Sequence, residues 1–135
     1  FDLLAKYNGW ALYSEFMNRT TSNPITVNPT NSSQISAVYA GKGFMSQMSY
    51  LFKNNFEIAA RYATSKPSSK LYENAEAPSL NEKQIENYEL GVTRYFYGHR
   101  LKIQGGLMYS KLTDLRTESF AEGYYSAVFQ MELGI

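Results

Sequence analysis

Apolar and polar side chains alternate one by one over long parts of this sequence. The clearest stretch is 88–110, where Tyr88 and Leu90 share one parity while Glu89 and Gly91 share the other. Successive side chains of a β-strand point to opposite faces of the sheet, so this alternation predicts strands with one apolar face and one polar or small face. Two alternating runs separated by a tight turn predict a hairpin.

The same periodicity predicts six strands in all. The first lies within 2–19, with clear alternation from Trp10 onward, and places Tyr7 and Gly9 on its polar side. The second spans 34–52, where the sequence Gly41-Lys42-Gly43 predicts a β-bulge. The other four strands are expected at 56–64, 85–97, 101–112 and 124–135, with the Gly98-His99-Arg100 turn inside the central hairpin and Ile135 as the last strand residue.

The expected connections alternate in length. Long polar loops at 20–33 and 65–83 follow the first and third strands, whereas the turns near 53–55 and 98–100 are short and 113–123 is of medium length. Outer-membrane barrels combine short periplasmic turns with long outer loops, and about 9–11 residues of strand cross the membrane. This order favours a transmembrane barrel with its C-terminus on the periplasmic side. A soluble sheet that buries the apolar face remains the alternative.

The composition narrows the functional classes. Aromatic residues make up 16% of the chain, with 12 Tyr and 8 Phe, and they gather near strand ends as interfacial girdles do. The net charge of +1 gives no electrostatic reason to expect nucleic-acid binding. With no Cys and a single His, we expect no disulfide, no metal site and no cofactor. The sequence shows no Ser-His pair suited to nucleophilic catalysis, so we expect no catalytic residue. The enzymatic alternative is a pair of carboxylates among Glu57, Glu89 and Glu132.

Three stretches resemble the phosphate-selective porin O and P family in its Bacteroidetes-type form. They are Tyr-Asn-Gly-Trp…Glu…Arg (7–19), Phe-Glu-Ile-Ala-Ala-Arg-Tyr (56–62) and Gly-Val-Thr-Arg-Tyr-Phe-Tyr-Gly-His-Arg-Leu-Lys-Ile-Gln (91–104). The resemblance implies an all-β, antiparallel, up-and-down transmembrane β-barrel of about 16 strands, often trimeric. Residues 1–135 would then be a fragment that supplies the six C-terminal strands. The implied location is the bacterial outer membrane, with lipid and the remaining strands or other outer-membrane subunits as partners.

If the apolar parity faces lipid, the polar parity lines the lumen of a channel. The expected function is passive diffusion of small polar or ionic solutes, with anions such as phosphate among them. The alternatives are a structural barrel segment within a larger outer-membrane complex and a soluble ligand-binding barrel. The lumen candidates comprise three cations and four anions, a balance that does not favour anion selectivity: Glu15, Arg19, Gln47, Glu57, Arg61, Glu89, Lys102, Gln104, Gln130 and Glu132.

Two further expectations concern charged side chains. Glu57 and Arg61 lie four residues apart on one strand face, too far for a direct pair, so each is expected to pair with neighbouring strands. Arg94 shares the parity of the lipid-facing residues near a short turn, where an arginine can extend its charged end to lipid headgroups.

Overall fold

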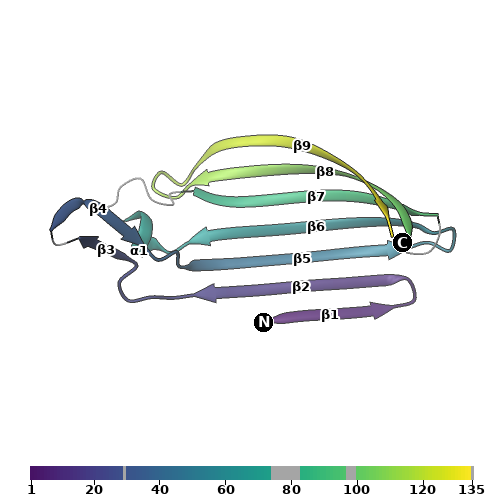
Figure 1. The fold of residues 1–135 in the computed structure, drawn as a ribbon, viewed down its shortest axis with the longest axis horizontal. Helices are drawn as coiled ribbons and strands as arrows, with labels where there is room; N and C mark the ends of the chain where they lie inside the picture. Colours follow the sequence, from purple (N-terminus) through teal and green to yellow (C-terminus); the bar gives the residue numbers. More distant parts are fainter. Residues whose placement is uncertain (29, 74–82, 97–99, 135) are drawn as a thin grey trace.

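Seven strands lie side by side in one antiparallel sheet (Figure 1). The structure is a computed structural model that describes residues 1–28, 30–73, 83–96 and 100–134. The sheet order is β1-β2-β5-β6-β7-β8-β9, an up-and-down meander, which confirms the all-β antiparallel prediction. The bounds are β1 (Asp2–Tyr7), β2 (Trp10–Arg19), β5 (Gly41–Leu51), β6 (Phe56–Pro67), β7 (Lys83–Tyr95), β8 (Leu101–Asp114) and β9 (Ser119–Leu133).

The first predicted strand is in fact two strands, so the main sheet has seven strands and not six. Asn8 and Gly9 have φ angles of 47° and 88° and form the tight turn between β1 and β2. Positive φ at both central residues is typical of the hairpin turn that Asn-Gly favours. The turn pairs Tyr7 with Trp10, which puts Tyr7 on the apolar face and corrects its predicted polar placement.

The second predicted strand is also divided. Its beginning belongs to β4 (Asn31–Ala37), which pairs with β3 (Ile25–Asn28) in a separate two-stranded sheet, so the expected loop 20–33 contains a strand. The predicted bulge at Gly41-Lys42-Gly43 is wrong, because β5 pairs with β2 and β6 without a register shift. A single helical turn, α1 (Ser69–Tyr72), follows β6 near this arm.

Most of the expected connection 113–123 is strand. The turn between β8 and β9 is confined to 115–118, and the register shifts at Leu112/Thr113. The backbone N–H groups of Arg116 and Thr117 donate to the Asp114 carboxylate at 2.8 and 3.0 Å, which closes the turn locally. The expected Gly98-His99-Arg100 turn lies largely outside the described residues, as does Ile135.

The two ends of the sheet differ in the length of their connections, and four of these connections have the length that the sequence predicts. The short-turn end carries Asn8-Gly9, 52–55 and 96–100, together with the last described residue, Gly134, whose N–H donates to the Arg100 carbonyl. The long-connection end carries 20–40 and 68–82, and also the compact turn 115–118. In Figure 1 the short-turn end lies on the right, and the β3–β4 arm extends from the long-connection end on the left.

The two faces of the main sheet differ in polarity, and large apolar side chains of one face are exposed. Rows of paired residues place Met48, Ala60, Leu90 and Leu107 on one face, which we call the apolar face. Leu90 and Leu107 are each 65% exposed. The opposite row Gln47, Arg61, Glu89, Met108 and Ser126 marks the polar face.

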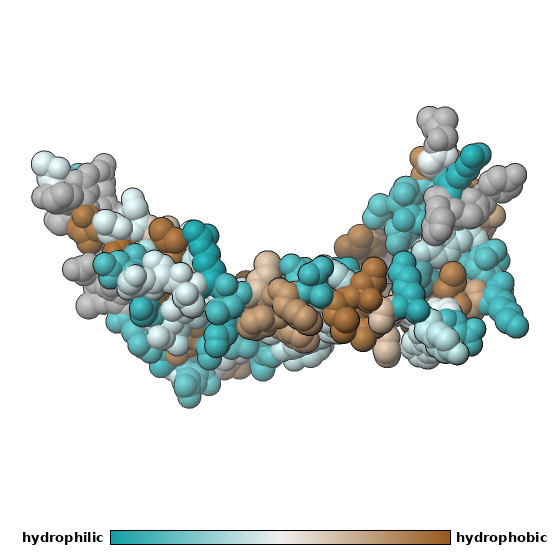
Figure 2. All heavy atoms as spheres, turned by 90° about the horizontal axis from the view of Figure 1, so that it is seen from below, coloured by the Kyte–Doolittle hydropathy of each residue, from teal (hydrophilic) through white to brown (hydrophobic). Residues whose placement is uncertain are grey.

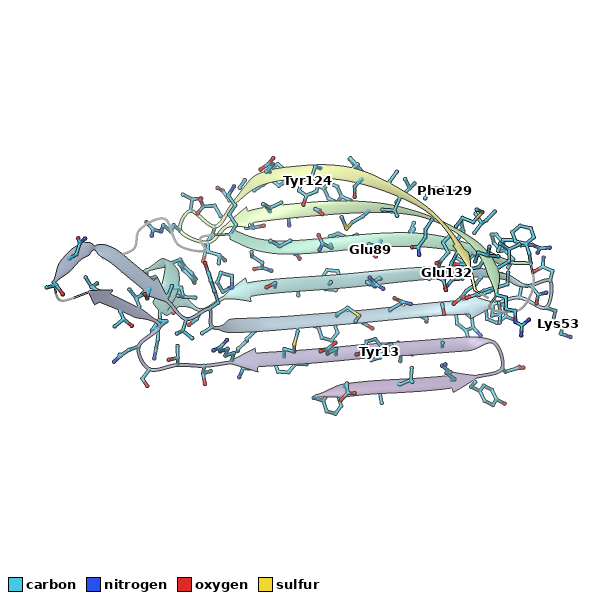
Figure 3. All side chains as sticks on the ribbon, in the orientation of Figure 1. Tyr13, Lys53, Glu89, Tyr124, Phe129 and Glu132 are labelled. Carbon is cyan, nitrogen blue, oxygen red and sulfur yellow. The ribbon has the colours of Figure 1, made fainter. Side chains whose placement is uncertain are left out.

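The best-buried side chains of the main sheet stand on this polar face. They are Ser49, Thr93 and Ser110, at 6%, 8% and 0% exposure. The buried hydrophobic residues of the described chain, Ala40 and Leu71, lie at the long-connection end, away from the middle of the sheet. Side chains cover both sides of the ribbon along its length (Figure 3), and the molecule is bent, with a hollow between two raised ends (Figure 2).

Gly9→Ala should destabilise the β1–β2 hairpin. An L-residue at this positive φ costs roughly 1–2 kcal/mol, and a Cβ there would lie 2.9 Å from the Leu51 carbonyl oxygen. The free energy of unfolding in urea, followed by fluorescence of Trp10, should fall by at least that amount. Gly43→Ala is the matched control, since its Cβ would meet only ordinary contacts beginning at 3.8 Å. Equal losses in both variants would contradict the assigned turn.

Candidate functional site: the polar face of the sheet

All ten candidates for the lumen lie on the polar face. The pairing of each strand with the next fixes this arrangement, because residues directly opposite one another in an antiparallel ladder share a face. The candidates fall into rows across the sheet, of which one joins Gln47, Arg61 and Glu89 and another joins Gln104 and Gln130. The remaining members of the set on this face are Glu15, Arg19, Glu57, Lys102 and Glu132.

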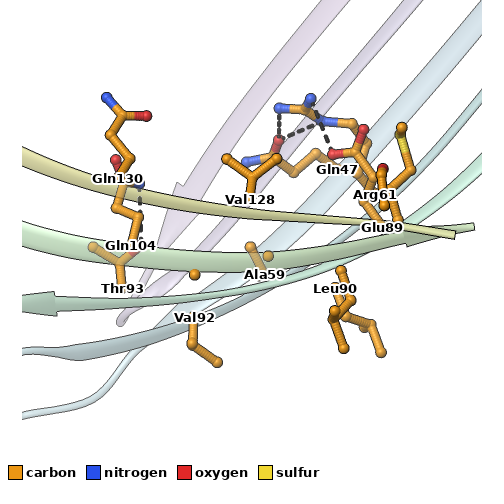
Figure 4. A pocket seen from close by; sticks show the side chains of 16 residues that line it. Gln47, Ala59, Arg61, Glu89, Leu90, Val92, Thr93, Gln104, Val128 and Gln130 are labelled. Atoms are coloured by element: carbon orange, nitrogen blue, oxygen red, sulfur yellow. Dashed lines mark hydrogen bonds and ion pairs between the residues drawn. The ribbon is translucent and has the colours of Figure 1, made fainter.

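Arg61 is the centre of the most connected group. Its Nε and Nη2 donate to the Gln47 Oε1 atom at 2.9 and 2.6 Å, and its Nη1 lies 3.3 Å from the Glu89 carboxylate. Figure 4 shows these three side chains on one side of the sheet, with Leu90 on the other side. The predicted cross-strand pairing of Arg61 is confirmed, and its guanidinium is therefore engaged on both sides.

A second polar group lies closer to the short-turn end. The Lys102 ammonium is 2.9 Å from the Glu132 carboxylate, and the Tyr95 hydroxyl donates to Glu57 at 2.6 Å. Glu57 therefore also has its partner on a neighbouring strand, as predicted. Because Glu57, Glu89 and Glu132 each face a different donor, the three carboxylates considered for acid–base chemistry belong to separate contacts.

A hollow of about 390 Å³ lies between these groups. Its floor is a row of small residues, Ala59, Gly91 and Gly106, which continues from Ser49. Side chains with hydrogen-bonding or ionic groups surround it, and Val128 projects beside it (Figure 4). The hollow is an open depression lined by small, apolar and polar residues together. The described residues contain no group of three or more His, Cys, Asp or Glu side chains suited to a metal ion.

Ser110, Asn87, Thr93 and Tyr13 also form polar contacts on this face but were not among the predicted site residues. Ser110 donates to the Asn87 side chain at 2.8 Å, and Gln104 donates to Thr93 at 3.2 Å. The Tyr13 hydroxyl donates to Glu15 at 3.1 Å. Their parity already placed them on the polar side, but the partners become evident only once the register of neighbouring strands is known.

The apolar face carries two lines of aromatic rings. Near the long-connection end, ring centroids 4.8–6.5 Å apart link Phe44, Tyr62, Tyr88, Tyr109 and Tyr125 across five strands. We call this line the outer belt. A second line near the short-turn end, the inner belt, links Trp10, Tyr50, Phe52 and Phe56 through distances of 4.7–6.3 Å.

The surface between the belts contains little unsatisfied polarity. The hydroxyls of Ser14 and Ser46, which pair across β2 and β5 on this face, bond each other at 2.8 Å. Arg94 lies near the inner belt, where its guanidinium donates to the Asn54 carbonyl in the short turn and lies 6.0 Å from the Phe96 ring centroid. Its charge is thus directed toward the end of the sheet, as the sequence predicted.

No family model, curated protein or solved structure matches this chain. Among the described residues, no helix has the length and apolar character that a membrane-spanning helix needs.

The Arg61–Glu89 contact should contribute modestly to stability. Because the two side chains are 43% and 33% exposed, water screens the pair, and a double-mutant cycle with Arg61→Ala and Glu89→Ala should give a coupling of about 0.2–1 kcal/mol. The free energies of unfolding of the two single variants and the double variant provide the measurement. Arg19→Ala combined with Glu89→Ala should be additive, because Arg19 lies three strands away; a zero coupling for Arg61 would refute a structural contribution.

Proposed function

We propose that this chain forms part of the wall of an outer-membrane, porin-like barrel that permits passive diffusion of small polar or ionic solutes. The observation that carries the proposal is the reversed sheet: apolar side chains are exposed, whereas polar side chains pair with one another on the opposite face. In a membrane barrel the apolar face meets lipid and the polar face meets water in the lumen. The two aromatic belts support this orientation, since aromatic girdles mark both membrane interfaces.

The separation of the belts along the strands supports a sheet that crosses a membrane. On β5 the belts lie at Phe44 and Tyr50, and on β6 they lie at Tyr62 and Phe56, each about 20 Å apart along the strand. From β5 to β6 both belts shift by two residues toward the short-turn end, because Phe44 pairs with Thr64 and Tyr50 with Ile58. The outer belt then continues without a further shift, because Tyr62 pairs with Tyr88, Tyr88 with Tyr109 and Tyr109 with Tyr125, so the support lies in the separation of the two belts.

The edges of the sheet favour a larger barrel. Strands β1 and β9 each have a neighbour on one side only among the described residues. Lipid offers no hydrogen-bond partner for a free strand edge, so spanning sheets close on themselves. Further strands, from the same polypeptide or from other subunits, would complete the barrel, and about 16 strands is the size that the family resemblance implies. From the same resemblance we propose that the barrel contacts outer-membrane lipid and assembles as a homotrimer.

The charge pattern favours a weakly selective passage. Anion channels present rings of Lys or Arg to the lumen, but Arg61 and Lys102 on this face are each paired with a carboxylate. Little free positive charge remains in the middle of the wall to attract phosphate. We therefore expect small neutral and charged solutes to pass, and we assign no phosphate selectivity to these strands.

Replacing Leu90 by Arg should destabilise the protein in a bilayer. Leu90 lies on the apolar face between Tyr88 of the outer belt and Arg94, which pairs with Phe56 of the inner belt, and Arg at the membrane midplane of a barrel costs about 2–4 kcal/mol. Gln130→Arg, on the polar face, should change the free energy of unfolding by less than about 1 kcal/mol. Unfolding in urea from lipid vesicles provides the comparison, and equal tolerance of both substitutions would reject the membrane orientation.

Single cysteines can establish which face meets lipid, because the chain contains none. In vesicles, a charged water-soluble thiol reagent should modify Met108→Cys and spare Leu107→Cys. Without a membrane, Leu107 is more exposed than Met108. Faster modification of Leu107→Cys than of Met108→Cys would therefore mean that water contacts the apolar face, as in a soluble protein. Labelling of both sites in denaturant is the control.

A structural segment within a larger outer-membrane complex is the second candidate, because it has the same two faces. Ion conductance distinguishes the two functions. Modification of Met108→Cys in the complete protein should change the single-channel conductance if this face lines a pore. If the complete protein conducts no ions, or if modification of Met108→Cys leaves its conductance unchanged, the structural segment is favoured.

A further inference from the structure

Two lysines oppose each other on the apolar face just beyond the outer belt. Lys42 of β5 pairs directly with Lys66 of β6, and Asn18 of β2 pairs with Lys42 on the other side. Both lysines are exposed. Side chains that face each other across an antiparallel pair have Cβ atoms about 4.5–5.5 Å apart, and like charges in such positions destabilise a sheet.

The described residues provide no carboxylate for either lysine. The three ion pairs of the described chain involve Arg61, Lys102 and Lys111, and none includes Lys42 or Lys66. Lys111 forms a useful contrast, because it lies on the same face and near the same level but contacts Glu86 at 3.2 Å. The Lys42–Lys66 pair is therefore a site of concentrated positive charge.

The neighbouring side chains are hydrogen-bond donors. Asn18 flanks the pair on β2, and Gln84 lies on β7 beside the end of β6, where its amide donates to Thr64 at 3.3 Å. Two ammonium groups with amides on both sides form a surface that matches the several acceptor oxygens of a phosphate group.

The position along the strands indicates where the phosphate comes from. Lys42 and Lys66 lie two residues beyond Phe44 and Thr64, and thus immediately outside the aromatic line that marks the interface. Lysines at this level can extend along the apolar surface and place their ammonium groups among lipid headgroups. A solute that crosses the lumen would meet the other face of the sheet.

We propose that Lys42 and Lys66 together bind the phosphate of an anionic lipid headgroup in the leaflet at the long-connection end. This inference depends on the proposed membrane orientation. The bound phosphate offsets the repulsion between the two ammonium groups and holds one lipid against β5 and β6. The site thereby anchors the long-connection end of the wall at a fixed depth.

Lipid binding by the complete protein tests the site. Native mass spectrometry from a zwitterionic detergent would count bound molecules of phosphorylated lipid A, with phosphatidylcholine, whose zwitterionic headgroup has no net charge, as the reference. Lys42→Gln with Lys66→Gln should weaken lipid A binding about thirtyfold, or roughly fivefold for each lysine. Lys42→Arg with Lys66→Arg should retain it.

The control removes the same amount of charge elsewhere. Lys6→Gln with Lys53→Gln changes the polar face of β1 and a turn at the short-turn end, and should leave lipid A binding within about twofold. An equal loss in this control would overturn the proposal, since net charge alone would then explain binding. Binding of inorganic phosphate with an affinity equal to that of lipid A would also overturn it, in favour of a free anion.

A stability measurement separates this site from the membrane orientation itself. In zwitterionic detergent, Lys42→Gln should raise the unfolding temperature because it removes like-charge repulsion; with lipid A present, the same change should lower it. The same sign in both conditions would reject the lipid site. If Leu107→Cys is instead labelled faster than Met108→Cys, the membrane orientation is rejected. The effect of lipid A on the unfolding temperature would then indicate an anion site on a soluble protein.

Discussion

The backbone register of seven consecutive strands determines nearly every other feature, because no second layer of the described chain packs on the main sheet. A slip of one residue between two strands would exchange their faces, moving Leu90 to the side of Arg61 and Glu89 to the side of the aromatic belts. The register is continuous from β1 to β8, and its shift at Leu112/Thr113 lies close to the end of the last strand pair. The separation of polar and apolar surface therefore rests on hydrogen bonding between strands.

Each face satisfies the requirements of a different environment. On the polar face, ion pairs and side-chain hydrogen bonds connect neighbouring strands, so Arg61 and Lys102 each have a carboxylate partner on the same face. On the apolar face, the hydroxyls of Ser14 and Ser46 bond each other. Positive charge without a carboxylate gathers at Lys42 and Lys66, beyond the aromatic rings. The same sheet thus combines a nearly neutral polar face with a cluster of positive charge beyond the outer belt.

The sequence predicted the regions where strict alternation continues, such as 88–96 and 101–112, and all ten polar-face residues with them. It failed where local signals interrupt the periodicity. Asn8-Gly9 is a strong hairpin signal, but the two-residue turn puts Tyr7 and Trp10 on the same face although their positions differ in parity, so counting parity through the turn gave one strand. Strands in 20–33 and 113–123 were missed because polar residues on both faces obscure alternation. Individual partners such as Gln47 for Arg61 depend on register, which composition does not specify.

The meander also has a consequence for the order of folding. Every strand of the main sheet pairs only with its neighbours in the meander, so each new pairing closes one loop, whose entropic cost grows only slowly with its length. The hairpins β5–β6 and β7–β8, joined by short turns, can form early as kinetic units, whereas β6 and β7 must first bring together the ends of the longer segment 68–82. Assembly by successive addition of hairpins would leave only one growing edge at a time open to wrong partners.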